Sequence, residues 1–110
     1  MATTYKILGQ SQPTNTNNAT LYTVPASTQA IVSTLTACNA SITDTTFRIF
    51  VVPSGGSATT ANALFYDGEL VANSTISFTL GITLNTGDSL VVRASTGTSV
   101  TFQAFGSELS

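Results

Sequence analysis

The sequence has very few charged residues, no histidine, no tryptophan and a single cysteine. Three Lys or Arg and five Asp or Glu give a formal net charge of −2 over 110 residues. The cations Lys6, Arg48 and Arg93 are too few and too scattered to follow a phosphate backbone, so nucleic-acid binding is not expected. No apolar stretch approaches the roughly 20 residues of a membrane-spanning helix, so no membrane partner is expected either.

The missing residue types also exclude most catalytic and metal-binding chemistry. Histidine is the commonest general base and metal ligand, and without it neither the Ser residues nor Cys38 have the partner that activates a nucleophile. Asp67 and Glu69 flank Gly68, which is typical of a solvated turn rather than of paired catalytic carboxylates. No Asp-rich loop supplies the roughly six to eight oxygens that Ca²⁺ needs. We therefore expect no catalytic residue, no cofactor and no metal site.

The single cysteine, Cys38, excludes a disulfide within the chain. Two interpretations stay open for its thiol. A lone cysteine in a strand is commonly a small buried apolar residue, but Cys38 is also a candidate for an intermolecular disulfide with a partner subunit. The N-terminus lacks the basic start and apolar core of a secretory signal, so we expect synthesis in a cytoplasm.

Apolar and polar residues alternate along most of the chain with a period of two, the pattern of half-buried strands. The 21 Thr and 13 Ser residues suit the solvated face of a pleated sheet. Turn-forming segments recur about every 8–12 residues, which predicts an antiparallel β-sandwich, and eight strands favour a jelly roll. The expected strands are 5–8, 21–24, 28–39, 45–52, 63–66, 74–80, 89–95 and 100–105.

The pattern predicts one all-β domain over residues 1–110, with an extended N-terminal arm over residues 1–18 as an option. In the longest strand, simple alternation places Ile31, Ser33, Leu35 and Ala37 on one face. Asp67 and Gly68 are expected to form a turn, and residues 81–88 are expected to be a connection without a strand.

Several strands carry apolar residues on both faces, so apolar side chains on part of an outer sheet face must be shielded from water by other protein atoms. Because a nearly neutral surface promotes association, we expect another subunit to provide that cover. The alternative is that loops of the same chain provide it. The terminal segments 5–10 and 102–110 also mix apolar and neutral polar residues and are expected to make contacts. The candidate interface residues are Tyr5, Ile7, Phe50, Val52, Val91 and Phe105.

Seven short segments carry a resemblance to a known group of proteins. They are Tyr5–Gln10, Leu21–Ala26, Cys38–Asn39, Thr46–Ile49, Leu80–Leu84, Gly87–Asp88 and Phe105–Glu108. Together they resemble small virion structural proteins of tailed bacteriophages, especially those of cyanobacterial and marine phages. The stretch LYTVPA before a β-run is also widespread in phage tail, fibre and head accessory domains. The resemblance implies a small β-sandwich that has no catalytic activity and functions by assembly.

Three functions are compatible with this sequence. The first is a capsid decoration or cement protein that binds the major capsid protein and stabilises the head lattice as a homo-oligomer, with a trimer favoured. The second is a tail, baseplate, collar or fibre-associated protein, in which Cys38 or the N-terminal segment attaches to another virion protein. The third is a small receptor- or glycan-binding module that uses Tyr5, Tyr22 or Tyr66. The first two place the protein in the virion after synthesis in the bacterial host cytoplasm.

Overall fold

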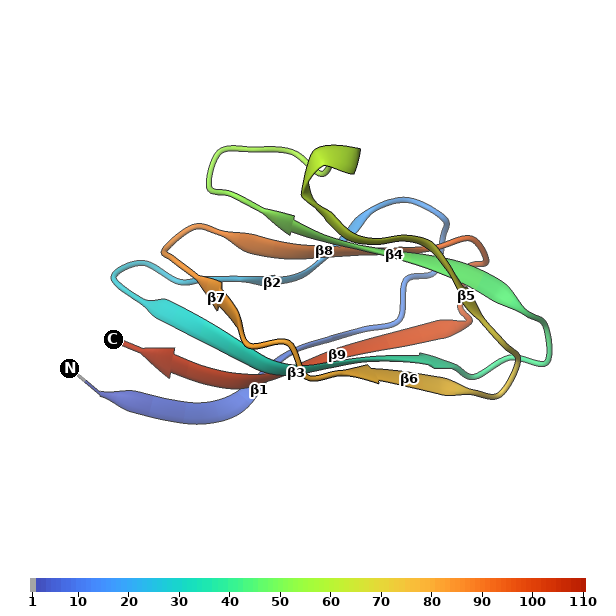
Figure 1. The fold of residues 1–110 in the computed structure, drawn as a ribbon, viewed down its shortest axis with the longest axis horizontal. Coiled ribbons are helices and arrows are strands. Elements are labelled where there is room, and N and C mark those ends of the chain that lie inside the picture. Colours follow the sequence, from blue (N-terminus) through green and yellow to red (C-terminus); the bar gives the residue numbers. More distant parts are fainter. Residues whose placement is uncertain (1) are drawn as a thin grey trace.

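The computed structural model describes residues 2–110 as two antiparallel sheets packed face to face (Figure 1). The five-stranded sheet contains β1 (Thr3–Ser11), β9 (Val100–Leu109), β3 (Gln29–Asn39), β6 (Thr75–Phe78) and β7 (Ile82–Leu84). The four-stranded sheet contains β2 (Ala19–Thr23), β8 (Ser89–Ala94), β4 (Thr45–Val52) and β5 (Ala63–Leu70), in that order. One turn of 3₁₀ helix, η1 (Thr60–Asn62), precedes β5.

The order of the strands is that of a jelly roll. β6 and β7 both pair with the same edge of β3. β7 pairs with residues 30–32 and β6 with residues 35–38, so together they occupy the place of one interrupted strand. With these two counted together, the chain changes sheet at every connection except the one between β4 and β5. The sandwich and the eight-stranded jelly roll predicted from the sequence are therefore confirmed.

One apolar core fills the space between the sheets. The Phe47 ring lies 5.8, 6.2 and 6.5 Å, between ring centroids, from Phe65, Phe78 and Phe102 respectively. Phe65 and Phe78 also stack on each other at 4.0 Å. These four residues come from both sheets, and burying one such side chain contributes about 1.5–3 kcal/mol, so the aromatic cluster holds the two sheets together at this end of the sandwich.

An irregularity in β3 corrects the predicted face of Ile31. The pairing of β3 with β9 shifts between Val32 and Thr34, which is the mark of a β-bulge. Val32 before the shift and Leu35 after it are both buried, whereas Ile31 is 49% exposed. Simple alternation was wrong here because one extra residue reverses which side chains face the core.

Three other local predictions also differ from the structure. Residues 3–11 of the expected N-terminal arm form the edge strand β1, paired with β9. Asp67 and Gly68 lie within β5 instead of ending it, although Asp67 has the positive φ of 55° expected of a turn residue. Ile82 and Leu84, expected in a connection, form β7 because they pair with the part of β3 that β6 leaves free.

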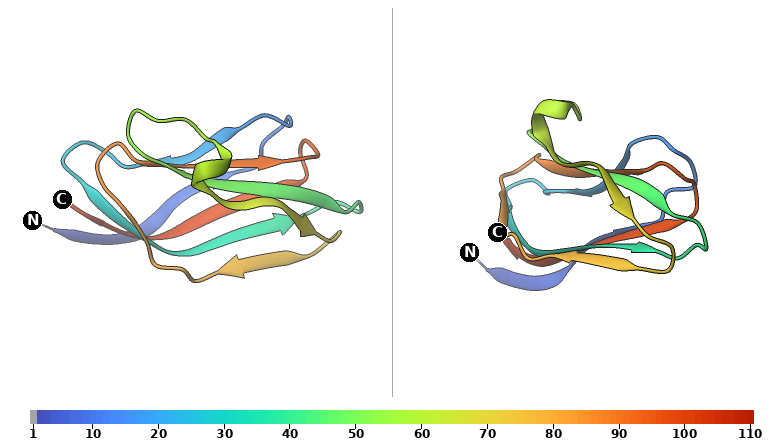
Figure 2. Two further views of the ribbon diagram at one scale, coloured as in Figure 1. Left: turned by 45° about the horizontal axis from the view of Figure 1, so that its top comes forward. Right: turned by 45° about the vertical axis from the view of Figure 1, so that its right-hand side comes forward.

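Phe50 and Val52 are covered by their own chain. Their exposed fractions are 3% and 5%, although both lie outside the main core cluster. Tyr66 presents the edge of its ring to Phe50 at 6.4 Å, and residues 53–62, including η1, lie over this side of β4 (Figure 2). At these two positions, loops of the same chain therefore bury the side chains, as the alternative from the sequence proposed. Neither side chain is accessible to another subunit.

Candidate assembly surface

The outer face of the five-stranded sheet carries an apolar patch made by three neighbouring strands. Tyr5 of β1, Ser107 of β9 and Ile31 of β3 lie in one row across the sheet. Ile7 and Phe105 lie opposite each other in the next row. Tyr5 is 85% exposed and Ile7 is 53% exposed, while Phe105 is half-buried. These four apolar residues, Tyr5, Ile7, Ile31 and Phe105, are called the outer patch below.

A shallow apolar groove crosses the outer patch. Its lining includes Tyr5, Lys6, Ile31, Phe105 and Ser107. Tyr5 thus projects beside a hollow on the same face. A face that combines a projection with an adjacent hollow can meet a second copy of itself about a two-fold axis, since each copy offers both features.

No charged side chain lies on the outer face of this sheet among residues 2–110. Its strands contain only two ionised residues, Lys6 and Glu108, and both alternate with the patch residues and point to the opposite side. The Lys6 ammonium lies 3.2 Å from one Glu108 carboxylate oxygen. The buried Tyr22 hydroxyl donates a hydrogen bond of 2.6 Å to the other oxygen. Apolar and neutral polar side chains alone therefore form the outer face.

The carboxyl of Glu108 has a lowered pKa in this small network. The hydrogen bond from Tyr22 lowers the pKa of Glu108, and Lys6 lowers it further. Burial, together with the bond to Glu108, raises the pKa of Tyr22. A carboxyl whose pKa is lower in the folded chain stabilises the fold above its unfolded pKa, and this contribution disappears as the pH falls through the folded pKa.

Replacing Glu108 by Gln is therefore expected to lower the free energy of unfolding near neutral pH and to have little effect in acid. Urea unfolding at about pH 7 and about pH 3, on either side of the range where carboxyl groups titrate, measures the difference. Glu69→Gln, at an exposed position of β5, is the control and is expected to change little at either pH. An equal loss for Glu108→Gln at both pH values would contradict this role.

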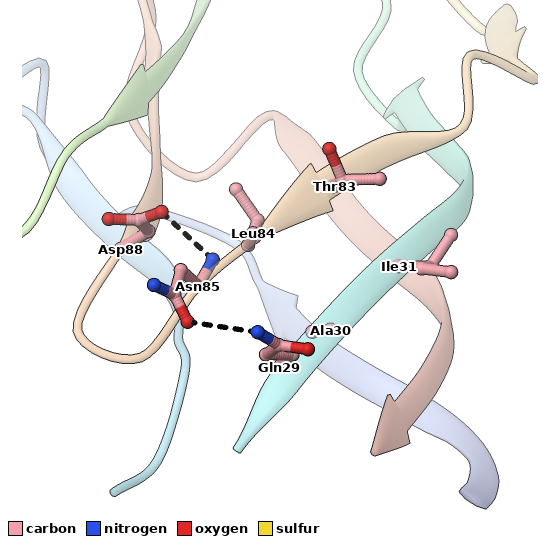
Figure 3. A pocket seen from close by; sticks show the side chains of 7 residues that line it. All are labelled: Gln29, Ala30, Ile31, Thr83, Leu84, Asn85 and Asp88. Atoms are coloured by element: carbon pink, nitrogen blue, oxygen red, sulfur yellow. Dashed lines mark hydrogen bonds between the residues drawn. The ribbon is translucent and has the colours of Figure 1, made fainter. Parts of the chain in front are cut away.

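A second hollow lies at the end of the seam between β3 and β7 (Figure 3). There the Gln29 amide donates to the Asn85 side-chain oxygen at 3.4 Å. Asp88 accepts the Asn85 and Ser54 backbone N–H groups, each at 2.9 Å. Both carboxylate oxygens of Asp88 therefore hold backbone N–H groups in place at this hollow.

Four charged residues, Arg48, Asp67, Glu69 and Arg93, belong to the four-stranded sheet. Arg48 makes two hydrogen bonds to the Asp67 carboxylate, at 2.7 and 3.2 Å, and its guanidinium lies 3.9 Å from the centre of the Tyr66 ring. The hydrogen bond from Arg48 lowers the pKa of Asp67. Arg93 stands opposite Arg48 in the pairing of β4 with β8. The two outer faces of the sandwich thus differ sharply in charge.

The structure brings together only part of the predicted interface set. Tyr5, Ile7 and Phe105 share the outer patch, and Ile31 joins them, which sequence alternation missed because of the bulge in β3. Val91 is half-buried on the other sheet, opposite Phe50.

Cys38 and the tyrosines occupy separate places. The Cys38 thiol is free and half-buried on the outer side of β3, between Thr75 and Thr101. Tyr22 is buried, and Tyr5 and Tyr66 belong to different sheets. The three tyrosines therefore do not form a common sugar-binding groove.

Neither a metal site nor a membrane-spanning helix is found in the part of the chain that the structure describes. No three His, Cys, Asp or Glu residues in that part lie close enough together to hold a metal ion. Its helical content is limited to the single turn η1, so it has no helix long and apolar enough to cross a bilayer.

The strand order defines the class of protein, an eight-stranded jelly-roll β-sandwich. A chain in the structure of infectious bursal disease virus, Gx strain, has a similar fold, with a TM-score of 0.51 and 15% identity; the match covers 97% of this chain. A chain of the Gt strain has a TM-score of 0.47 and 12% identity, covering 96%. This chain spans 31% of the length of each viral chain. No protein family and no curated protein matches the sequence.

Proposed function

We propose that this protein is a non-enzymatic structural component of a virion and functions by associating with other protein chains. The observation that carries the proposal is the outer patch, which lies on a sheet face where residues 2–110 place no charged side chain. An apolar patch of this kind on a soluble domain commonly marks a protein contact. The similar fold in a chain of a virus supports the viral context.

Within that class, we propose a head decoration protein of a tailed bacteriophage. It would form a homo-oligomer and would bind the major capsid protein after synthesis in the host cytoplasm. The sandwich has extents of 45 × 26 × 21 Å. A single small domain of this size is better suited to repeated positions on a shell than to building a fibre. The second hypothesis is a tail, baseplate, collar or fibre-associated protein, and the half-buried Cys38 thiol is its candidate attachment point.

The copy number in purified virus particles tests this proposal. Quantitative mass spectrometry against the major capsid protein is expected to give a ratio near one, or a simple fraction such as about one third, as a symmetric lattice requires. A few copies to a few dozen copies per particle would favour the tail hypothesis instead. Absence of the protein from particles would overturn both.

A further inference from the structure

The sheet edges of this sandwich differ in how well they are protected against pairing with another strand. Natural proteins protect edges with short strands, bulges, prolines and charges. β5 carries Asp67 and Glu69, and its pairing is irregular. β6 and β7 are four and three residues long. β2 has five residues and a pairing shift, and Pro25 follows it.

The first half of β1 lacks this protection. β1 has nine residues, and its pairing with β9 is regular from Thr3 to Ile7, with the shift only after that. No proline lies in this half, and its one charge, Lys6, is paired with Glu108. Within the described residues β9 is the only strand that pairs with β1, so one long side of the strand is open.

The pattern of hydrogen bonds shows which backbone groups this open side presents. Ala2 and Ser110 exchange both of their N–H···O bonds, at 2.6 and 3.0 Å. In an antiparallel ladder such pairs alternate with pairs that exchange none. Thr4 and Lys6 therefore bond to β9, whereas the N–H and C=O groups of Thr3, Tyr5 and Ile7 point away from it. Two of these three residues also carry side chains of the outer patch.

We propose that the open side of β1 pairs in antiparallel fashion with β1 of a second copy, which joins the two five-stranded sheets into one. This inference rests on the proposed function and deepens it by naming the partner and the line of contact. A second copy fits because the two outer faces that become continuous carry no charged side chain among residues 2–110. Two chains of net charge −2 therefore meet without like charges opposed on that face. The pairing is two-fold and gives a dimer, in place of the trimer favoured from the sequence.

Charge also selects the register. If Tyr5 lies opposite Tyr5 of the second copy, Thr3 pairs with Ile7 on both sides and all three open residues form hydrogen-bonded pairs. Lys6 then lies opposite Thr4 of the second copy. A shift that places Tyr5 opposite Ile7 brings the two Lys6 side chains face to face, and like charges directly opposite are destabilising. The first register is therefore the one we propose, with the Tyr5 rings beside the two-fold axis.

Hydrogen exchange measured by NMR on the wild-type protein tests the pairing without any substitution. At concentrations where sedimentation gives twice the 11.3 kDa chain mass, the amides of Thr3, Tyr5 and Ile7 are expected to be protected. On dilution to the monomer they are expected to exchange as rapidly as exposed loop amides, such as those of Gly55 and Ser57. Rapid exchange of all three amides in the dimer would overturn the proposal.

A pair of variants isolates the backbone contribution. Tyr5→Pro and Tyr5→Thr both remove the ring, but only proline removes the N–H group, which has no partner in β9. Because Tyr5→Pro loses both symmetry-related hydrogen bonds, its dimer dissociation constant is expected to be about 30 times that of Tyr5→Thr. Equal constants, or a wild-type trimer that Tyr5→Pro leaves intact, would overturn edge pairing. The copy number in particles is measured independently, so that result would leave the proposed function standing.

Discussion

Replacing Ile7 by Asp is expected to raise the dissociation constant of the self-associated protein about 10- to 30-fold, because the two-fold pairing loses both of its Ile7–Thr3 cross-strand contacts, each worth up to about 1 kcal/mol. Ile7 lies in the outer patch opposite Phe105, on a face without other charged side chains among the described residues. Lys6, the one cation of β1, is already paired with Glu108. Since Ile7 is half-exposed in the monomer, the fold itself is expected to lose about 1 kcal/mol or less.

Ile42→Asp is the matched control for this experiment. It makes the same chemical change at an isoleucine that is 89% exposed in the turn between β3 and β4, away from the outer patch. Sedimentation equilibrium of both variants separates a local effect from the general effect of one more negative charge. If Ile42→Asp weakened association as much as Ile7→Asp, the outer patch would not be the contact surface.

Gly106→Ala is expected to lower the free energy of unfolding by about 3 kcal/mol, the upper end of what overpacking costs. A Cβ at Gly106 would overlap the carbonyl oxygen of Ile31 and lie 3.1 Å from the Cα of Val32. Both atoms belong to the backbone of β3 at its bulge. They can move only if the pairing between β3 and β9 is broken, so the strain cannot be relieved by rotating a side chain.

Gly56→Ala provides the comparison for Gly106→Ala. Gly56 lies in the loop after β4, and its nearest neighbour would be the Pro53 carbonyl oxygen at 3.1 Å, which a loop can accommodate. Urea denaturation followed by far-UV circular dichroism is expected to show a large loss for Gly106→Ala and a small one for Gly56→Ala. Comparable losses would mean that the close approach of β9 to β3 is not a constraint on the fold.

Much of the fold could be predicted from the sequence because apolar alternation reports directly which strands are half-buried. The strand 45–52 was predicted with the correct ends, and the eight-stranded jelly roll followed from the number and spacing of strands. Ile31 could not be placed, because a β-bulge reverses the alternation and leaves no local signal in a run of β-branched and small polar residues.

The cover over Phe50 and Val52 could not be predicted either. Apolar residues on both faces of a strand indicate only that a cover exists, and a loop of the same chain satisfies the pattern as well as a second subunit does. The network of Lys6, Tyr22 and Glu108 joins residues 86 and 102 positions apart, which no local spacing reveals. Tyr5, Ile7 and Phe105 came from the terminal segments, where the paired strands β1 and β9 bring them onto one face.

The most direct test of the assembly surface is the mass of the wild-type protein as a function of concentration, measured by sedimentation equilibrium. The outer face, which carries no charged side chain among residues 2–110, and the open edge of β1 predict a reversible rise from 11.3 kDa to twice that mass, which Ile7→Asp shifts to higher concentration and Ile42→Asp does not. If the wild-type protein stayed at 11.3 kDa up to about 1 mM, its dissociation constant would exceed about 1 mM, which corresponds to only about 4 kcal/mol of binding free energy. That result would contradict self-association through this surface.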